Sequence, residues 1–265
     1  MTFSPLARCS LTLAAAVLPL VLSLALAFAP FAPAQEHDHS RPEHQGHDGM
    51  NMPMTPADPA IEAANRAAQF AYKRESEANH HLAGVLVIFA GLFILAEPFL
   101  RQRYPSVRYA WALCFLGSGL FLLIFSDTEL WPFGPKSWWY GLTQNMEDLQ
   151  HKVFAAILLS LAYIEIQRAR GVLKAAWAAW AFPVLAIFGS ILLLFHEHHI
   201  GMHGADHMAI MHRIQSEHLS FSIAGVGIGL SKGLSEVRFR WQSLFAKIWP
   251  VLLIVLGILL VLYRE

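Results

Sequence analysis

The sequence predicts an all-α protein, a polytopic membrane bundle of about six transmembrane helices that follow a cleaved signal peptide. Hydrophobic types make up 55% of the 265 residues and charged types only 14%, whereas a soluble domain carries about 25% charged residues. The mean hydropathy is +0.43, and several apolar runs approach the ~20 residues that a helix needs to span a lipid bilayer. The charges balance, with 19 Lys+Arg and 19 Asp+Glu. The chain therefore has neither the basic excess of a nucleic-acid binder nor the high net charge of a disordered chain.

Residues 1–34 have the pattern of a secretory signal peptide. Arg8 supplies a short positive segment, an apolar run covers 11–28, and Ala32-Pro33-Ala34 fits the small-x-small cleavage pattern. The alternative is an uncleaved first transmembrane helix, and in both cases the next segment lies outside the cytoplasm. Cleavage leaves Cys114 as the only cysteine, so no disulfide framework is expected.

Residues 35–79 are predicted to form a polar tail that ends in a short amphipathic helix over 61–79. The tail has no hydrophobic periodicity, and its candidate metal ligands are His37, His39, His44, His47, Met50, Met52 and Met54. Imidazole binds copper, zinc and nickel, whereas the soft thioether of Met favours Cu(I). The combination predicts a tail that captures copper. The alternative is a solubilising segment whose His and Met residues bind nothing.

Six apolar segments of residues 80–265 predict the transmembrane domain. They lie near 81–100, 108–126, 152–167, 175–195, 217–232 and 247–263. The loops after the first, third and fifth segments are basic, while the two intervening loops carry almost no Lys or Arg. Basic loops face the cytoplasm by the positive-inside rule. We therefore expect a bacterial inner-membrane protein whose tail and loops 127–151 and 196–216 lie on the periplasmic side.

This topology gathers the histidines at one side of the membrane. Four of the 14 His lie in the tail, and the other ten lie at the outer ends of spans or in the 196–218 loop. The candidate ligands of that loop are His196, His198, His199, His203, His207, Met208, Met211, His212 and His218. On a continuous helix, one stripe would run from His196 to His207 and a second from His207 to His218, although glycines at 201 and 204 are expected to interrupt it. Alternating His and Met favour copper; the alternative is a solvated polar loop.

A second site is predicted where distant spans meet. His81, His151 and His218 each stand at the outer end of an apolar span, and ionisable groups at that depth usually face the bundle interior. We expect these three to form one site, the alternative being interfacial histidines bonded to headgroups or backbone. Asp127 and Glu129 are the candidate carboxylates that would orient a metal-binding His.

Several other residues in or near the spans are expected to have structural roles and not to bind metal. Glu97 is expected to pair with Arg101 and Glu165 with Arg168, because these spacings place the partners on one helix face. Cys114 is expected to act as a small apolar residue. Close helix packing is the expected role of three glycines in the fifth span, Gly225, Gly227 and Gly229.

Four features of the layout point to a known family. They are the exported His/Met tail, the Asn79-His80-His81-Leu82-Ala83-Gly84 start of the first span, the Gln150-His151-Lys152 start of the third, and the HEHHIGMHGADHM run. In this layout, which covers residues 80–232, the chain resembles the copper resistance protein D group of bacterial membrane proteins. The chain is shorter, with fewer spans than expected of that group. The resemblance implies an inner-membrane protein of periplasmic copper tolerance or uptake.

Three functions are compatible with the sequence. In the first, the tail captures copper, preferably Cu(I), and passes it to the outer His/Met site for uptake, tolerance or delivery, by transfer across the membrane or by sequestration. A periplasmic copper carrier is the candidate partner, and zinc is the alternative metal. In the second, two of His81, His151 and His218 ligate a b-type haem in an electron carrier, although no second His layer is present on the inner side. In the third, the outer site is a metalloenzyme that uses Glu197, Asp206 or Glu217 as acid/base or ligand.

Overall fold

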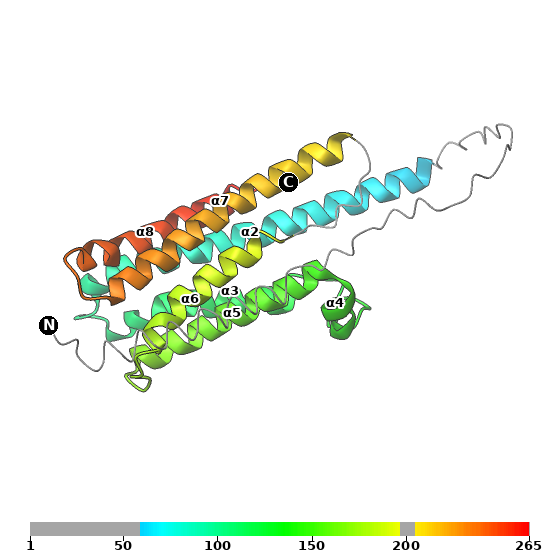
Figure 1. The fold of residues 1–265 in the computed structure, drawn as a ribbon. Helices are drawn as coiled ribbons and strands as arrows, with labels where there is room; N and C mark the ends of the chain where they lie inside the picture. Colours follow the sequence, from blue (N-terminus) through cyan, green and yellow to red (C-terminus); the bar gives the residue numbers. More distant parts are fainter. Residues whose placement is uncertain (1–58, 197–204, 265) are drawn as a thin grey trace, which may run out of the picture.

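The computed structural model describes residues 59–196 and 205–264, and over this part of the chain the protein is an all-α bundle without β-strands. The elements are α2 (Pro59–Leu100), the 3-10 helix η1 (Pro105–Tyr109), α3 (Ala110–Phe125), α4 (Trp138–Gln144), α5 (Met146–Ala169), α6 (Ala178–Leu193), α7 (Ala205–Glu236) and α8 (Gln242–Val261). Figure 1 shows one elongated bundle with the short α4 at one end. The predicted signal peptide and the His/Met ligands of the tail lie outside the described residues.

Each of the six predicted spans falls on one of these helices. Within the described residues, four segments are long and apolar enough to cross a membrane, and they lie in α2, α3 with η1, α5 and α8. α6 is a shorter apolar helix, while the second half of α7 carries the predicted fifth span. The expected amphipathic helix and the first span are one continuous helix of 42 residues. Residues 60–83 contain neither Gly nor Pro, so nothing in this stretch ends the helix.

Glycines bring neighbouring helices of the bundle close together. A Cβ added at Gly84 would stand 2.6 Å from the carbonyl oxygen of Gly257, where α2 packs on α8. A Cβ at Gly225 would stand 2.1 Å from Ser190 Oγ, where α7 packs on α6. The expected packing role is confirmed for Gly225 and Gly229, because a Cβ at Gly229 would also stand 2.9 Å from the backbone carbonyl oxygen of Pro183 in α6.

Four aromatic side chains fill the middle of the bundle, and we call them the aromatic septum: Trp111, Phe115, Phe182 and Trp249. Their ring centroids lie between 5.4 and 6.1 Å apart, mostly edge to face. Aromatic pairs in this geometry add about 0.5–1.5 kcal/mol to the burial of their large apolar surfaces. Cys114 is buried in the same core, which confirms its interpretation as a small apolar residue.

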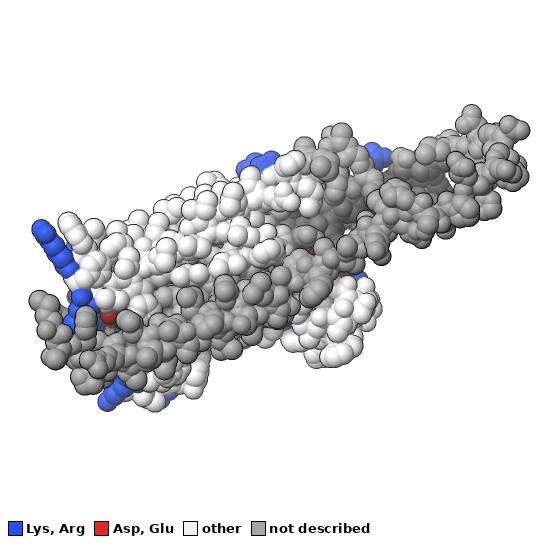
Figure 2. All heavy atoms as spheres, viewed as in Figure 1, with Lys and Arg blue, Asp and Glu red and all other residues white. Residues whose placement is uncertain are grey.

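The basic loops meet at the end of the bundle opposite α4, which we call the basic end. It comprises the α2–η1, α5–α6 and α7–α8 connections, and Figure 2 shows Lys and Arg clustered there. The expected ion pairs Glu97–Arg101 and Glu165–Arg168 are confirmed, with N···O distances of 4.0 and 2.8 Å. The assignment of this end to the cytoplasm stays a prediction of the positive-inside rule.

Candidate metal centre

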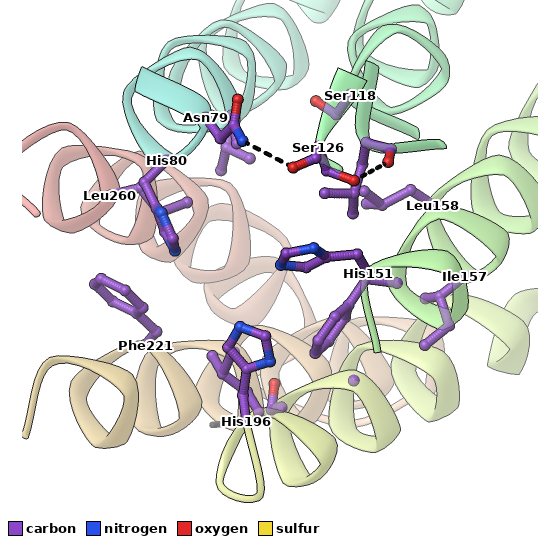
Figure 3. Close-up of a pocket in the computed structure, with 18 of the residues that line it drawn as sticks. Asn79, His80, Ser118, Ser126, His151, Ile157, Leu158, His196, Phe221 and Leu260 are labelled. Atoms are coloured by element: carbon purple, nitrogen blue, oxygen red, sulfur yellow. Dashed lines mark hydrogen bonds between the residues drawn. The ribbon is translucent and has the colours of Figure 1, made fainter. Parts of the chain in front are cut away.

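A cavity of about 540 Å³ opens between the helices at the end opposite the basic end, and we call it the His cavity. Its floor is apolar and includes Phe115 and Phe182 of the aromatic septum. Three histidines line it, and Figure 3 shows His80, His151 and His196 around a common space. Five carboxylates also line it: Glu75, Asp127, Glu129, Glu147 and Asp148. No Lys or Arg is among the described residues that line this cavity, although two of the carboxylates, Asp127 and Glu129, pair with Lys152 and Lys136 beside it.

Three of these residues form a group with metal-ligand geometry, which we call the central ligand group: Glu147, His151 and His196. Each offers one ligand atom, and these atoms all lie within 4.8 Å of one another. Glu147 and His151 are one helical turn apart on α5, a spacing that places both side chains on one face. His196 follows α6, which ends at Leu193. Two imidazoles and a carboxylate therefore meet from two separate elements.

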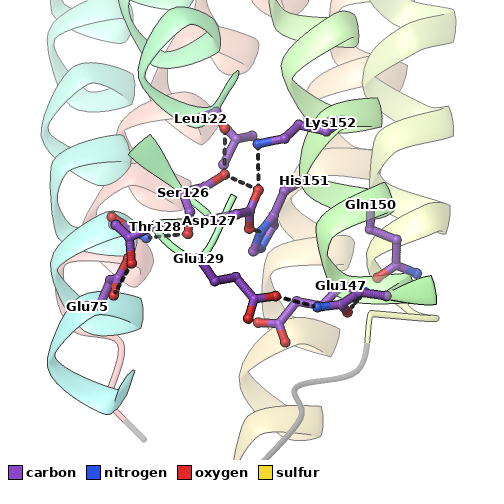
Figure 4. Close-up of polar contacts among 12 residues, drawn as sticks. Glu75, Leu122, Ser126, Asp127, Thr128, Glu129, Glu147, Gln150, His151 and Lys152 are labelled. Atoms are coloured by element: carbon purple, nitrogen blue, oxygen red, sulfur yellow. Dashed lines mark hydrogen bonds and ion pairs between the residues drawn. The ribbon is translucent and has the colours of Figure 1, made fainter. Parts of the chain in front are cut away.

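His151 is held by a carboxylate. Its Nδ1–H donates to Asp127 Oδ1 at 2.6 Å, and Asp127 Oδ2 accepts from Lys152 Nζ at 2.6 Å and from Ser126 Oγ at 2.7 Å (Figure 4). The proton on Nδ1 places the imidazole lone pair on Nε2, the arrangement by which carboxylates orient metal-binding His. Burial favours a raised pKa for Asp127, but the hydrogen bond from His151 and the hydrogen bond and charge of Lys152 prevail and hold the pKa of this carboxyl below its usual range. Asp127 thus stays ionised and keeps His151 in place.

His196 is oriented by an amide. Its Nδ1–H donates to Gln150 Oε1 at 2.5 Å, and Gln150 Nε2 donates to the carbonyl oxygen of Phe195 at 2.8 Å. Because the Gln150 NH₂ group is used in this second bond, the amide oxygen is the atom that faces the imidazole. His196 therefore also carries its lone pair on Nε2, and both histidines of the central ligand group present the nitrogen that binds metals.

Glu147 is positioned by the start of α5. Asn145 caps this helix, and its Oδ1 accepts from the Glu147 backbone N–H at 3.1 Å. Tyr72 of α2 donates its hydroxyl to Glu147 Oε1 at 2.5 Å. A carboxylate in the first turn is also stabilised by the helix dipole. These contacts hold the Glu147 carboxyl group at a position where the residue is only 7% exposed.

A further buried carboxylate lies next to this group. Asp148 is 3% exposed, and its Oδ2 has no hydrogen-bond partner among the residues that the structure describes. A buried carboxyl oxygen without a partner costs free energy, and Asp127 and Glu147 are carboxylates of the same sign nearby. Either protonation of Asp148 or a cation in the His cavity would reduce that cost.

Two more histidines extend the ring contacts across the bundle. His218 of α7 lies 5.2 Å from His196, measured between ring centroids, and His80 of α2 lies 6.2 Å from His218. His80 donates from Nδ1 to the carbonyl oxygen of Ser76 at 2.8 Å and stacks on Tyr263 at 4.0 Å. Four histidines from four parts of the chain thus form a row of neighbouring rings, in the order His151, His196, His218 and His80.

The expected site of His81, His151 and His218 is only partly assembled. His81 donates from Nε2 to the carbonyl oxygen of Tyr263 at 3.1 Å, and its neighbour His80 faces the cavity instead. Adjacent helical residues point about 100° apart, so one of the two must turn away. Among the residues that sequence reasoning missed, Glu147 was open to detection from its i, i+4 spacing to His151.

The 196–218 loop is only partly described. The structure ends α6 at Leu193 and begins α7 at Ala205, so His196 and His207 do not share one helix and the first predicted stripe is interrupted. On α7, Met211 is half-buried and His212 is exposed. Outside the described residues or side chains lie His198, His199, His203, His207 and Met208, together with Glu197 and Asp206 of the enzyme hypothesis. Glu217 pairs with Arg213 at 3.2 Å.

Comparison with known proteins identifies no relative: no protein-family model, no curated protein and no solved structure matches this chain.

Proposed function

We propose that this protein binds copper at the central ligand group and holds the ion at the His end of the bundle. The observation that carries the proposal is the convergence of Glu147, His151 and His196, with Nδ1 of each imidazole held by a hydrogen bond to a neighbouring side chain. Among divalent first-row ions, sites of nitrogen and oxygen ligands bind Cu²⁺ most tightly. The carboxylate suits Cu(II) or Zn(II), whereas the Met residues of the tail suit Cu(I).

The part of the bundle between the His cavity and the basic end favours retention or periplasmic delivery of the ion, and it argues against passage of the ion through the protein. The aromatic septum lies beneath the His cavity, and closely packed rings offer a dehydrated cation little compensation for its hydration. Beyond it, the basic end presents Arg and Lys side chains, which repel a cation. The proposed role is capture by the tail, transfer to the central ligand group and release to a periplasmic copper carrier.

The test is a metal titration of the detergent-purified full-length protein. The protein is loaded with Cu(II), Cu(I) or Zn(II), desalted and analysed for metal, with His196→Ala as the variant and Gln144→Ala as the control, because Gln144 is exposed on α4 and is no candidate ligand. We expect His196→Ala to lose about one tightly bound copper per chain relative to wild type, and Gln144→Ala to lose none.

Two outcomes would overturn the proposal. One is an equal copper content in wild type and His196→Ala, which would leave all binding to the tail. The other is a haem absorption band in the protein as isolated with little copper after loading, which would favour the b-type haem carrier. A preference for zinc over copper would keep the site and change the metal.

A further inference from the structure

The basic end contains a second cavity that the proposed metal chemistry does not use. It has a volume of about 600 Å³, and we call it the basic pocket. Its cationic lining comprises five residues, Arg101, Arg108, Arg168, Lys174 and Lys232. They come from the α2–η1 connection, η1, α5, the α5–α6 connection and α7, so distant parts of the chain converge on this pocket.

The cations outnumber the carboxylates that can neutralise them. Glu97 pairs with Arg101, and Glu165 pairs with Arg168. Glu236, which lies beside the pocket, contacts both Arg168 and Lys232. Among the described residues, five cations against these three carboxylates leave an excess of two positive charges. An anion with one or two negative charges would balance this excess.

Arg108 carries a donor that is ready for such an anion. Its Nη2 donates to the Tyr109 hydroxyl at 2.6 Å, and its guanidinium lies 4.7 Å from the Tyr109 ring centre. Its Nε is buried and has no hydrogen-bond partner among the described residues. A buried donor without an acceptor costs free energy, and guanidinium is the side chain best shaped to bind phosphate through two parallel hydrogen bonds.

The walls of the pocket also select an anion. Trp111 and Trp249 separate it from the His cavity, and the Lys232 ammonium lies 5.1 Å from the centre of the Trp249 ring. These indoles keep the cations in place while offering no acceptor that would compete with a ligand. Basic pockets between helices at the ends of a membrane bundle are suited to phosphate-bearing headgroups.

We propose that the basic pocket binds a phosphate group, carried either by an anionic phospholipid or by a soluble phosphate compound, with Arg108 as its main anchor. The site is independent of the metal centre. The excess positive charge and the buried Arg108 donor carry the assignment, and the source of the phosphate is decided by experiment.

The test uses the full-length protein in detergent and native mass spectrometry. Phosphatidylglycerol, phosphatidylcholine and inorganic phosphate are titrated separately, and retained adducts are counted for wild type, Arg108→Gln and Arg103→Gln. Arg103 is the matched control, since it is exposed in the same connection and does not line the pocket. Circular dichroism and gel filtration confirm that each variant keeps its helices and its size.

We expect wild type to retain phosphatidylglycerol roughly tenfold better than phosphatidylcholine, the scale of one charge-assisted hydrogen bond. Arg108→Gln should lose this preference, and Arg103→Gln should keep it. Retention of inorganic phosphate alone, lost in Arg108→Gln, would support the site with a soluble ligand as its source. Equal retention of both lipids by wild type without phosphate binding would overturn the proposal, as would equal losses in Arg103→Gln and Arg108→Gln.

Discussion

The His cavity and the basic pocket have similar volumes and opposite chemistry. Five carboxylates and three histidines line the first, and five cations with two carboxylates line the second. The aromatic septum contributes to both, with Phe115 and Phe182 facing the His cavity and Trp111 and Trp249 facing the basic pocket. One bundle thus presents lone pairs and negative charge at one end and hydrogen-bond donors and positive charge at the other.

This contrast between the two ends favours the proposed retention of a metal ion over its conduction through the protein. A path for a metal cation would need ligands or water along its length, because dehydration of an ion in a low-dielectric interior is costly. Here the ligands stop at the His cavity, and the charges beyond the septum are repulsive. The difference between the two ends therefore depends on three features of the molecule: the aromatic septum, the carboxylates that hold the histidines, and the ionisation of those carboxylates.

Removal of a septum ring is expected to have the largest effect. Phe182 is 2% exposed and contacts Trp111, Phe115 and Trp249. Phe182→Ala should lower the free energy of unfolding by about 3–5 kcal/mol, because it leaves a cavity between the two chambers. Thermal unfolding in detergent measures this loss. Phe99→Ala is the control, since Phe99 is 83% exposed, and should change stability by less than about 0.5 kcal/mol.

The same variants test the barrier. Vesicles with reconstituted wild-type protein and an internal copper indicator should respond no faster than empty vesicles, and those with Phe182→Ala should respond faster if the septum is what blocks the ion. Rapid copper entry with the wild type would contradict the separation of the two ends and favour uptake.

Loss of the carboxylate behind His151 is expected to weaken copper binding by about 10–100-fold. Asp127→Asn removes the charge that fixes the His151 tautomer and leaves Lys152 without its carboxylate partner. Competition with a chelator of known affinity measures the change. Glu129→Gln is the matched control, because Glu129 pairs with Lys136 in a partly exposed bridge of the kind that contributes little. Equal effects of the two variants would mean that general negative charge, not His orientation, controls binding.

The helical bundle and the positive charge of its basic end were largely predictable from the sequence, whereas the central ligand group was predictable only in part. Apolar runs and basic loops depend on composition, which the sequence displays directly, so the bundle and its charged end follow. The choice of His80 over His81 depends on the rotation of α2 about its axis. Residues 82–96 are apolar almost all round, so no periodicity fixes that rotation. Likewise, Gln150 and Glu147 became partners of His196 and Tyr72 only through contacts between distant segments.

Removal of the Tyr72 hydroxyl is expected to have a smaller effect. Tyr72→Phe deletes the hydrogen bond to Glu147 Oε1 and keeps the ring. Copper affinity should fall by roughly five- to tenfold, the scale of one ordinary hydrogen bond. The control is Tyr140→Phe, because Tyr140 is exposed on α4. If Tyr72→Phe bound copper as tightly as wild type, the Tyr72 hydroxyl would not position Glu147 for the ion.

The smallest expected effect is on the apoprotein between pH 7 and 5. Burial favours a raised pKa for Asp127, but the contacts with His151 and Lys152 outweigh it and hold the pKa of this carboxyl below its usual range. The stability that this lowered pKa supplies is present above the ordinary pKa of an Asp carboxyl and is lost as the pH falls through the lower pKa of the folded protein. Thermal unfolding of the apoprotein should therefore show a stability difference between wild type and Asp127→Asn that narrows only in acid strong enough to protonate Asp127. A difference that already narrows between pH 7 and 5 would contradict the lowered pKa of Asp127.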